Sequence, residues 1–104
     1  MITALVQFKL PQSISREQAR ETFSSTAKKY TTVSGLIRKY YVLAADGKTA
    51  GGVYLWKSQR AAELFYSDEW RHFIFDKYGA LPTVTYFDSP VIVDNEIGVI
   101  TTDA

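Results

Sequence analysis

Apolar and polar residues alternate along the first ten positions of the chain, and a helical spacing follows. The alternation predicts a β-strand over residues 2–10, which Pro11 ends. One face of this strand carries Ile2, Ala4, Val6, Phe8 and Leu10. Ser15 and Gln18 have the spacing of a capping box, so we expect a helix to begin at Ser15 or Arg16. The apolar stripe of that helix consists of Ala19, Phe23, Ala27 and Tyr30.

Two further strands are predicted in the middle of the chain, joined as a hairpin. Gly35 opens a strand over residues 36–44, and residues 45–48 have the composition of a tight turn. A third strand over residues 50–56 leads directly to Ser58, which is a natural helix N-cap. The apolar face of the helix that follows consists of Ala61, Ala62, Leu64 and Phe65.

The second half of the chain predicts a helical region in two pieces and then a strand. Ser67 supplies a second N-cap before an acidic first turn, and Gly79 is the expected C-terminal cap. Residues 83–93 predict a fourth strand that is broken or bulged near Pro90. In the tail, residues 97–101 have the composition of a short added strand.

The order strand, helix, strand, strand, helix, strand is that of an α+β, ferredoxin-like domain, in which two helices cover one face of an antiparallel sheet. A length of 104 residues with 46% hydrophobic content suits one domain over residues 1–104, with residues 94–104 as its tail. Both faces of the inner strands are apolar, so a single copy would expose one of them to water. We therefore expect a homodimer with the two sheets packed back to back.

Composition and charge exclude several functional classes. The net charge of +1 comes from 12 basic and 11 acidic residues that are interleaved, unlike the one-sided basic stripe of a nucleic-acid-binding protein. Cysteine is absent, which excludes disulfides, thiolate catalysis and sulfur-ligated metals. The N-terminal segment lacks a basic leader and is too short to span a membrane. We expect a cytoplasmic protein with no membrane or nucleic-acid partner.

Few side chains have the chemistry of a catalytic group. His72 is the one imidazole and can transfer protons near neutral pH, although a lone histidine on an amphipathic helix is more often a surface or packing residue. Arg38 can hold a carboxylate or enolate oxygen, or form a salt bridge with Asp88 or Glu63. The sequence has neither a second histidine nor a loop of metal ligands, so no metal site is expected.

Aromatic residues are the second candidate feature. The residues expected to converge where the second and third strands meet the second helical region are Tyr40, Tyr54, Trp56, Tyr66 and Trp70. Such a cluster suits a flat, partly polar ligand, whereas core packing better accounts for any one of these residues taken alone. Arg38 and Tyr40 share a strand face, so the cluster would place a fixed cation beside a phenol.

Several of these segments resemble the YdhR-like monooxygenases of the dimeric α/β-barrel superfamily. The resemblance extends from the first strand to about Val93. Its most specific parts are Ser34-Gly35-Leu36, Lys39, Tyr41, residues 50–56, Tyr78-Gly79 and Phe87-Asp88. The resemblance implies a homodimer with one pocket per subunit between sheet and helices, and an oxygenase role.

The chain is also similar to the haem-degrading monooxygenases of the same superfamily around residues 56–58. Those enzymes use an Asn, a Trp and an axial His. Gln7, Phe65 and Ile74 stand at the corresponding places of this chain. Haem degradation is therefore not the expected activity, and no cofactor is expected.

The resemblance and the aromatic cluster together predict a cofactor-independent monooxygenase that oxidises a small aromatic or phenolic compound with oxygen. In the expected mechanism His72 or Tyr66 removes a substrate proton, Arg38 and Trp70 hold the resulting anion, and the anion reduces oxygen. The expected remainder of the substrate site is Tyr40, Tyr54 and Trp56. Two alternatives stay open: a non-catalytic small-molecule-binding or stress-response dimer, and a structural dimer whose aromatic residues only fill the core.

Overall fold

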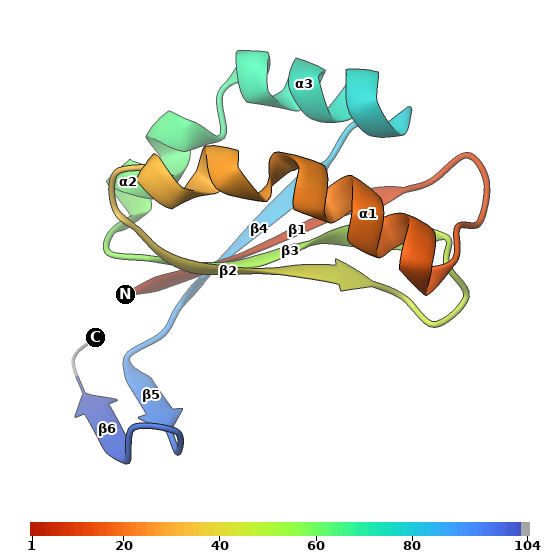
Figure 1. The fold of residues 1–104 in the computed structure, drawn as a ribbon. Coiled ribbons are helices and arrows are strands. Elements are labelled where there is room, and N and C mark those ends of the chain that lie inside the picture. The colour runs from red at the N-terminus through yellow and green to blue at the C-terminus, as the bar shows by residue number, and fades with distance from the viewer. Residues whose placement is uncertain (103–104) are drawn as a thin grey trace.

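The computed structural model describes residues 1–102, in which helices cover one face of a four-stranded antiparallel sheet (Figure 1). The strands are β1 (Ile2–Lys9), β2 (Leu36–Leu43), β3 (Thr49–Trp56) and β4 (Thr83–Asp88), in the spatial order β2-β3-β1-β4. The helices are α1 (Arg16–Ala27), the 3-10 helix η1 (Lys28–Thr32), α2 (Gln59–Phe65) and α3 (Asp68–Tyr78). This is the predicted ferredoxin-like order, with the second helical region in two pieces.

Local polar residues determine where the helices begin and end. The Ser15 hydroxyl accepts a hydrogen bond from the Gln18 N–H at 3.1 Å, and the Gln18 Oε1 accepts one from the Ser15 N–H at 2.8 Å, so the predicted capping box is present. Ser58 and Ser67 cap α2 and α3 with their hydroxyls. Gly79 ends α3 at a φ of 79°, which glycine adopts without strain. Among the helices of residues 1–102, none is both long and apolar enough to cross a membrane.

The face of the sheet that the helices cover carries the core. In the β1–β3 ladder Ala4 lies opposite Tyr54, and Val6 lies opposite Gly52. The buried side chains of these two strands, each at most 6% exposed, are Ala4, Val6, Phe8, Ala50, Tyr54 and Trp56. The helical segments add Ala19, Tyr30, Ala62, Trp70 and Ile74, and Tyr66 follows α2. Burial of each large apolar side chain favours folding by about 1.5–3 kcal/mol, so this layer is the main source of stability.

Strand β2 contains a bulge that changes which residues face the helices. Leu36 pairs with Trp56 while Arg38 pairs with Leu55, so Ile37 is an extra residue in the ladder. Beyond the bulge, the helix-covered face carries Lys39, Tyr41 and Leu43. The opposite face, which we call the open face, carries Arg38, Tyr40 and Val42.

The C-terminal segment leaves the sheet after β4. β5 (Val91–Asp94) and β6 (Val99–Thr102) pair with each other in a separate two-stranded hairpin. The break predicted near Pro90 therefore separates two sheets, and the predicted added strand forms as β6, away from the main sheet. Figure 1 shows the hairpin on the side that no helix covers. The last two residues of the expected tail, 103 and 104, lie outside the described residues.

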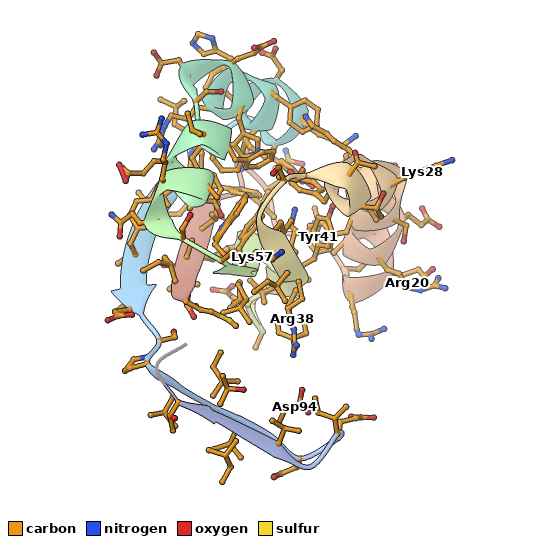
Figure 2. All side chains as sticks on the ribbon, turned by 90° about the vertical axis from the view of Figure 1, so that its left-hand side faces the viewer. Arg20, Lys28, Arg38, Tyr41, Lys57 and Asp94 are labelled. Carbon is orange, nitrogen blue, oxygen red and sulfur yellow. The ribbon has the colours of Figure 1, made fainter. Side chains whose placement is uncertain are left out.

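The open face of the sheet carries a group of apolar side chains, and so does the hairpin. Tyr40 and Phe87 are 57% and 52% exposed on the open face, and Leu5, Val53 and Leu55 lie between them half-buried. The exposed apolar residues of the hairpin include Val91, Val93, Val99 and Ile100. Arg38 and Asp94 connect the two parts through an ion pair of 3.6 Å, and Figure 2 shows these side chains pointing toward one another.

Replacement of Ser15 by alanine tests how much the first cap contributes. Ser15→Ala removes the acceptor of the Gln18 N–H, so we expect the free energy of unfolding to fall by about 1 kcal/mol in urea at one fixed protein concentration. Ser24 is exposed on the same helix, and Ser24→Ala is the matched control, with an expected change within about 0.5 kcal/mol. Equal losses in the two variants would contradict the capping role.

Candidate functional site

The structure brings four of the predicted aromatic residues together in the core. Tyr54, Trp56, Tyr66 and Trp70 are each at most 5% exposed. The ring centroids of Tyr66 and Trp70 are 4.7 Å apart, and those of Tyr54 and Tyr66 are 5.4 Å apart. The Trp56 Nε1–H donates to the Tyr66 hydroxyl at 3.1 Å, and the Trp70 Nε1–H donates to the Tyr30 hydroxyl at 3.3 Å. These contacts give each indole donor a partner, so the cluster is a satisfied, close-packed layer.

Arg38 and Tyr40 lie apart from this cluster. They share a strand face, as expected, but it is the open face of the sheet. Arg38 is exposed and pairs with Asp94 of the hairpin, whereas the sequence suggested Asp88 or Glu63 as its salt-bridge partner. The expected placement of a cation beside the buried aromatic residues therefore does not occur through Arg38.

His72 also lies apart from the cluster. It is exposed on α3, while Trp70 and Ile74 of the same helix are buried against the sheet. Tyr66, the other residue predicted to accept a proton, is held in the core. Burial raises the pKa of the Tyr66 phenol well above its ordinary value, so this group stays protonated near neutral pH and acts as a hydrogen-bond partner.

A small cavity lies between the sheet and the helices, beside the aromatic cluster. Its volume of about 10 Å³ is enough for about one water molecule. The residues that line it include Phe23, Tyr30, Lys39, Tyr41, Tyr54 and Tyr78. Of the four buried aromatic residues of the predicted site, only Tyr54 reaches this cavity.

Lys39 is the unexpected member of this cavity. Its Nζ lies 3.3 Å from the ring centroid of Tyr30, 3.7 Å from that of Tyr41 and 4.8 Å from that of Tyr54. Burial lowers the pKa of Lys39 to about 6, and the nearby Lys29 acts in the same direction. Among residues 1–102, no acidic side chain forms an ion pair with Lys39. An amine in this setting is largely uncharged at pH 7.

Glycine in β3 leaves the space that Lys39 occupies. A Cβ atom at Gly52 would lie 3.2 Å from the Lys39 Cε and 2.8 Å from the Tyr54 Cε1. Any larger residue would therefore press on both side chains. The sequence alone does not link Gly52 to Lys39, because Gly52 pairs with Tyr41 across the ladder and Lys39 pairs with Tyr54. The link becomes visible only in the folded structure.

An open groove follows the edge of the sheet between β2 and the helices α1 and η1. Its larger part has a volume of about 690 Å³ and is lined by residues that include Arg16, Arg20, Phe23, Ala27, Tyr41 and Leu43. A smaller part of about 270 Å³ is lined by residues that include Ala27, Tyr30, Leu36, Arg38, Lys39 and Tyr41. Ala27 and Tyr41 border both parts, which we together call the edge groove. Its size lies in the range of small-molecule sites.

Tyr41 stands between the edge groove and the small cavity. It lines both, its ring stacks on Phe23 at 4.9 Å, and its hydroxyl forms a 2.9 Å hydrogen bond with the Thr26 hydroxyl. Figure 2 shows Tyr41 between β2 and α1, with Arg38 further along the same strand. Lys39 likewise borders both the cavity and the smaller part of the groove. The edge groove thus borders the half-buried Lys39 side chain.

Arginines border both ends of the groove, of which Arg20 pairs with Glu17 and Arg38 pairs with Asp94. Arg16 and Arg20 border one end, and Arg38 borders the other. Such a site suits a flat aromatic compound that carries an acidic hydroxyl or develops negative charge. Within residues 1–102, no group of three or more histidine and acidic side chains is arranged to hold a metal ion.

The pH dependence of the free energy of unfolding should reveal the lowered pKa of Lys39. The unfolded chain binds a proton at Lys39 below a pH of about 10.4, whereas the folded chain binds it only below about 6. Between these values the unfolded state holds more protons, so stability rises with pH by up to about 1.4 kcal/mol per pH unit. We expect urea unfolding of the wild type to show this slope between pH 6 and 10, and Lys39→Met to lack it.

The exposed Lys48 supplies the control for that titration. Lys48→Met should follow the pH dependence of the wild type, since its amine is solvated in both states. Parallel curves for the wild type and Lys39→Met would mean that Lys39 is charged in the folded protein.

A protein-family model matches most of the chain. The model of the family described as the putative mono-oxygenase ydhR matches residues 5–81, which is more than half of the chain. No protein with a curated description has a significant match to the sequence.

Solved structures share the fold. A monooxygenase from the gene ActVA-Orf6 of Streptomyces coelicolor, in complex with nanaomycin D, has a TM-score of 0.66 at 18% identity over 85% of this chain and 86% of that chain. SnoaB, a cofactor-independent oxygenase from Streptomyces nogalater, has a TM-score of 0.61 at 12% identity over 85% and 91%. A putative antibiotic biosynthesis monooxygenase from Deinococcus radiodurans has a TM-score of 0.66 at 11% identity over 90% and 97%. At these identities the likeness establishes the fold alone.

Proposed function

Since the chain belongs to the ydhR family of putative mono-oxygenases, we propose that it oxidises a small aromatic compound with molecular oxygen, without a cofactor, in the edge groove. The observation that carries the proposal is the groove itself, because a space of about 690 Å³ lies next to a smaller one that the half-buried Lys39 lines. Two proteins of the same fold add support, since one is a monooxygenase bound to nanaomycin D and the other is a cofactor-independent oxygenase.

The reaction needs no outside reductant when the substrate is an enolisable aromatic ketone or a hydroquinone. Loss of a proton gives an electron-rich anion that reduces oxygen directly. For a methylene carbon beside a ring ketone, the carbon gains one oxygen atom as a carbonyl, and the second oxygen atom leaves as water with the two hydrogens of that carbon. The protein has to bind the flat ring, remove the proton and hold the anion.

The residues of the groove suit the binding of a flat ring. Phe23 and Tyr41 offer an aromatic wall, and Arg38, which pairs with Asp94, borders the η1 end. Trp56, Tyr66 and Trp70 line neither part of the groove, so we assign them to the support behind it. The exposed position of His72 does not favour it as the base.

Oxygen uptake by the metal-free protein tests the activity and its place. A panel of anthrones, hydroquinones and catechols should yield at least one compound that the wild type oxidises. Ala27→Trp puts a large ring into both parts of the groove, so we expect it to lower the uptake rate at least about tenfold. Ser25→Trp puts the same ring at an exposed neighbouring position of α1 and should retain the rate.

Each other outcome has a definite meaning. Uptake that survives in Ala27→Trp would move the reaction out of the edge groove. No uptake with any compound, together with thermal stabilisation by some of them that Ala27→Trp abolishes, would make the protein a non-catalytic binding module.

We also propose that the protein is a homodimer packed through the open face of its sheet. Tyr40 and Phe87 are more than half exposed there, beside a row of half-buried aliphatic residues. An apolar patch of this kind is typical of an interface between subunits. The hairpin extends on the same side with its own exposed valines, so it would add to the contact.

Charge on the open face tests the dimer. Tyr40→Glu together with Phe87→Glu should convert the protein to a monomer in sedimentation equilibrium, because two carboxylates per chain would have to be buried at the interface. Both positions are exposed in the single chain, so its fold should tolerate the change. Leu64→Glu, at a 69% exposed position of α2, should leave the association unchanged. A double variant that sediments like the wild type would exclude this interface.

A further inference from the structure

A lysine amine is enclosed by phenol rings at the point where the edge groove meets the core. We propose that Lys39 is the base of the reaction, and that its uncharged amine takes the acidic proton of an enolisable or phenolic substrate. This assignment rests on the proposed oxygenase function. It replaces His72 and Tyr66, the residues that the sequence suggested for the same step.

Lys39 is the candidate base that borders the edge groove. Lys39 lines both the small cavity and the η1 part of the edge groove, and the proposal places the hydroxyl of a bound ring beside its amine there. His72 borders neither part of the groove, and Tyr66 is 5% exposed with its hydroxyl paired to Trp56. Lys39 therefore has the geometry that a proton acceptor needs.

Among the described residues, the groups around Lys39 include no acid. The groups that face it are Tyr41 from its own strand, Tyr54 from β3, and Tyr30 and Lys29 from η1. Burial raises the pKa of Tyr41 and Tyr54, so both stay phenols. Lys29 lies over Phe73 of α3, 3.5 Å from its ring centroid, and the carboxylate that acts on it is Glu69. None of these groups supplies Lys39 with a negative partner, which keeps its amine available for a proton.

The ring faces around Lys39 stabilise its protonated form. The face of a phenol ring attracts a cation, and three rings lie within 5 Å of the Lys39 Nζ. The ammonium that forms when the substrate loses its proton is therefore stabilised by the rings and by the new anion. A base that is neutral at rest and accommodated when charged suits proton transfer near neutral pH.

The complete cycle returns the proton. The substrate C–H or O–H bond breaks, its electrons stay on the substrate as an enolate or phenolate, and Lys39 becomes an ammonium. The carbanion form reduces oxygen and bonds to it as a peroxide anion, which takes the proton back from Lys39. The hydroperoxide then loses water to give the carbonyl product, so Lys39 is again a neutral amine and oxygen is the only oxidant.

The substrate class follows from this arrangement. A neutral amine at the inner end of the site attracts no anion, so the compound enters the η1 part of the groove in its neutral form and ionises there. We therefore expect anthrones and other hydroxylated aromatic ketones to react.

The experiment combines a titration with a rate. Proton-detected NMR of the lysine Cε–Nζ groups should show one amine that titrates near pH 6, absent from Lys39→Met and present in the control Lys48→Met. The oxygen uptake rate of the wild type should rise with pH through the same value, because only the neutral amine accepts a proton. Lys39→Met should lower the rate at least about 100-fold with its far-UV circular dichroism unchanged.

Lys39→Arg extends the test with a group that is always charged. It should be as inactive as Lys39→Met, because a guanidinium cannot accept the substrate proton. Uptake retained in either variant, or lost in His72→Ala instead, would overturn the assignment while leaving the oxygenase in place. No uptake by the wild type, whatever Lys39 titrates at, would remove the oxygenase and the base together.

Discussion

Two adjacent glycines of β3, one packed against β1 and the other against β2, are the constraint on which the rest of this structure depends. A side chain at Gly51 would overlap the backbone carbonyl of Val6, so the two central strands could not pair in their present register. A side chain at Gly52 would press on Tyr54 and on the stem of Lys39. The pair thus fixes the ladder at the middle of the sheet and opens the space in which the buried lysine lies. Cross-strand neighbours, rather than turn geometry, explain why glycine stands in a strand here.

The two faces of this sheet have different tasks because only one of them is covered by helices. The covered face buries large rings that satisfy one another, as in the bond from Trp56 to Tyr66. The open face exposes Tyr40 and Phe87 and lies beside an apolar hairpin. Catalysis and assembly are therefore proposed on opposite sides of one layer. Arg38 belongs to both sides, since it borders the edge groove and pairs with Asp94 of the hairpin. A partner subunit that repositions the hairpin would alter that end of the groove.

Local chemistry made most of the fold predictable, and the site was less so. Capping at Ser15, Ser58 and Ser67 depends on residues within one helical turn, which is why each helix start could be predicted. The two faces of β2 carry nearly the same chemistry, since one has Arg, Tyr and Val and the other has Lys, Tyr and Leu. Periodicity could not say which of them meets the helices. The sequence reading placed Arg38 among the aromatics, and the fold places Lys39 there instead. The separate β5–β6 hairpin depends on tertiary placement, which a strand pattern does not contain.

Lys39 is half-buried and has no acidic partner among residues 1–102, so desolvation of its amine lowers the stability of the folded state near neutral pH. A carboxylate beside it would restore the charge and raise its pKa, but the ammonium would then have no room for a substrate proton. Arginine would stay charged in any such setting. Methionine fills a similar volume without the penalty, which makes the retained amine informative. The surrounding phenols present ring faces to the cation that the proposed proton transfer would form. Lys39 lowers the stability of the folded protein, and packing alone gives no reason for that cost. The cost is consistent with a chemical role for its amine.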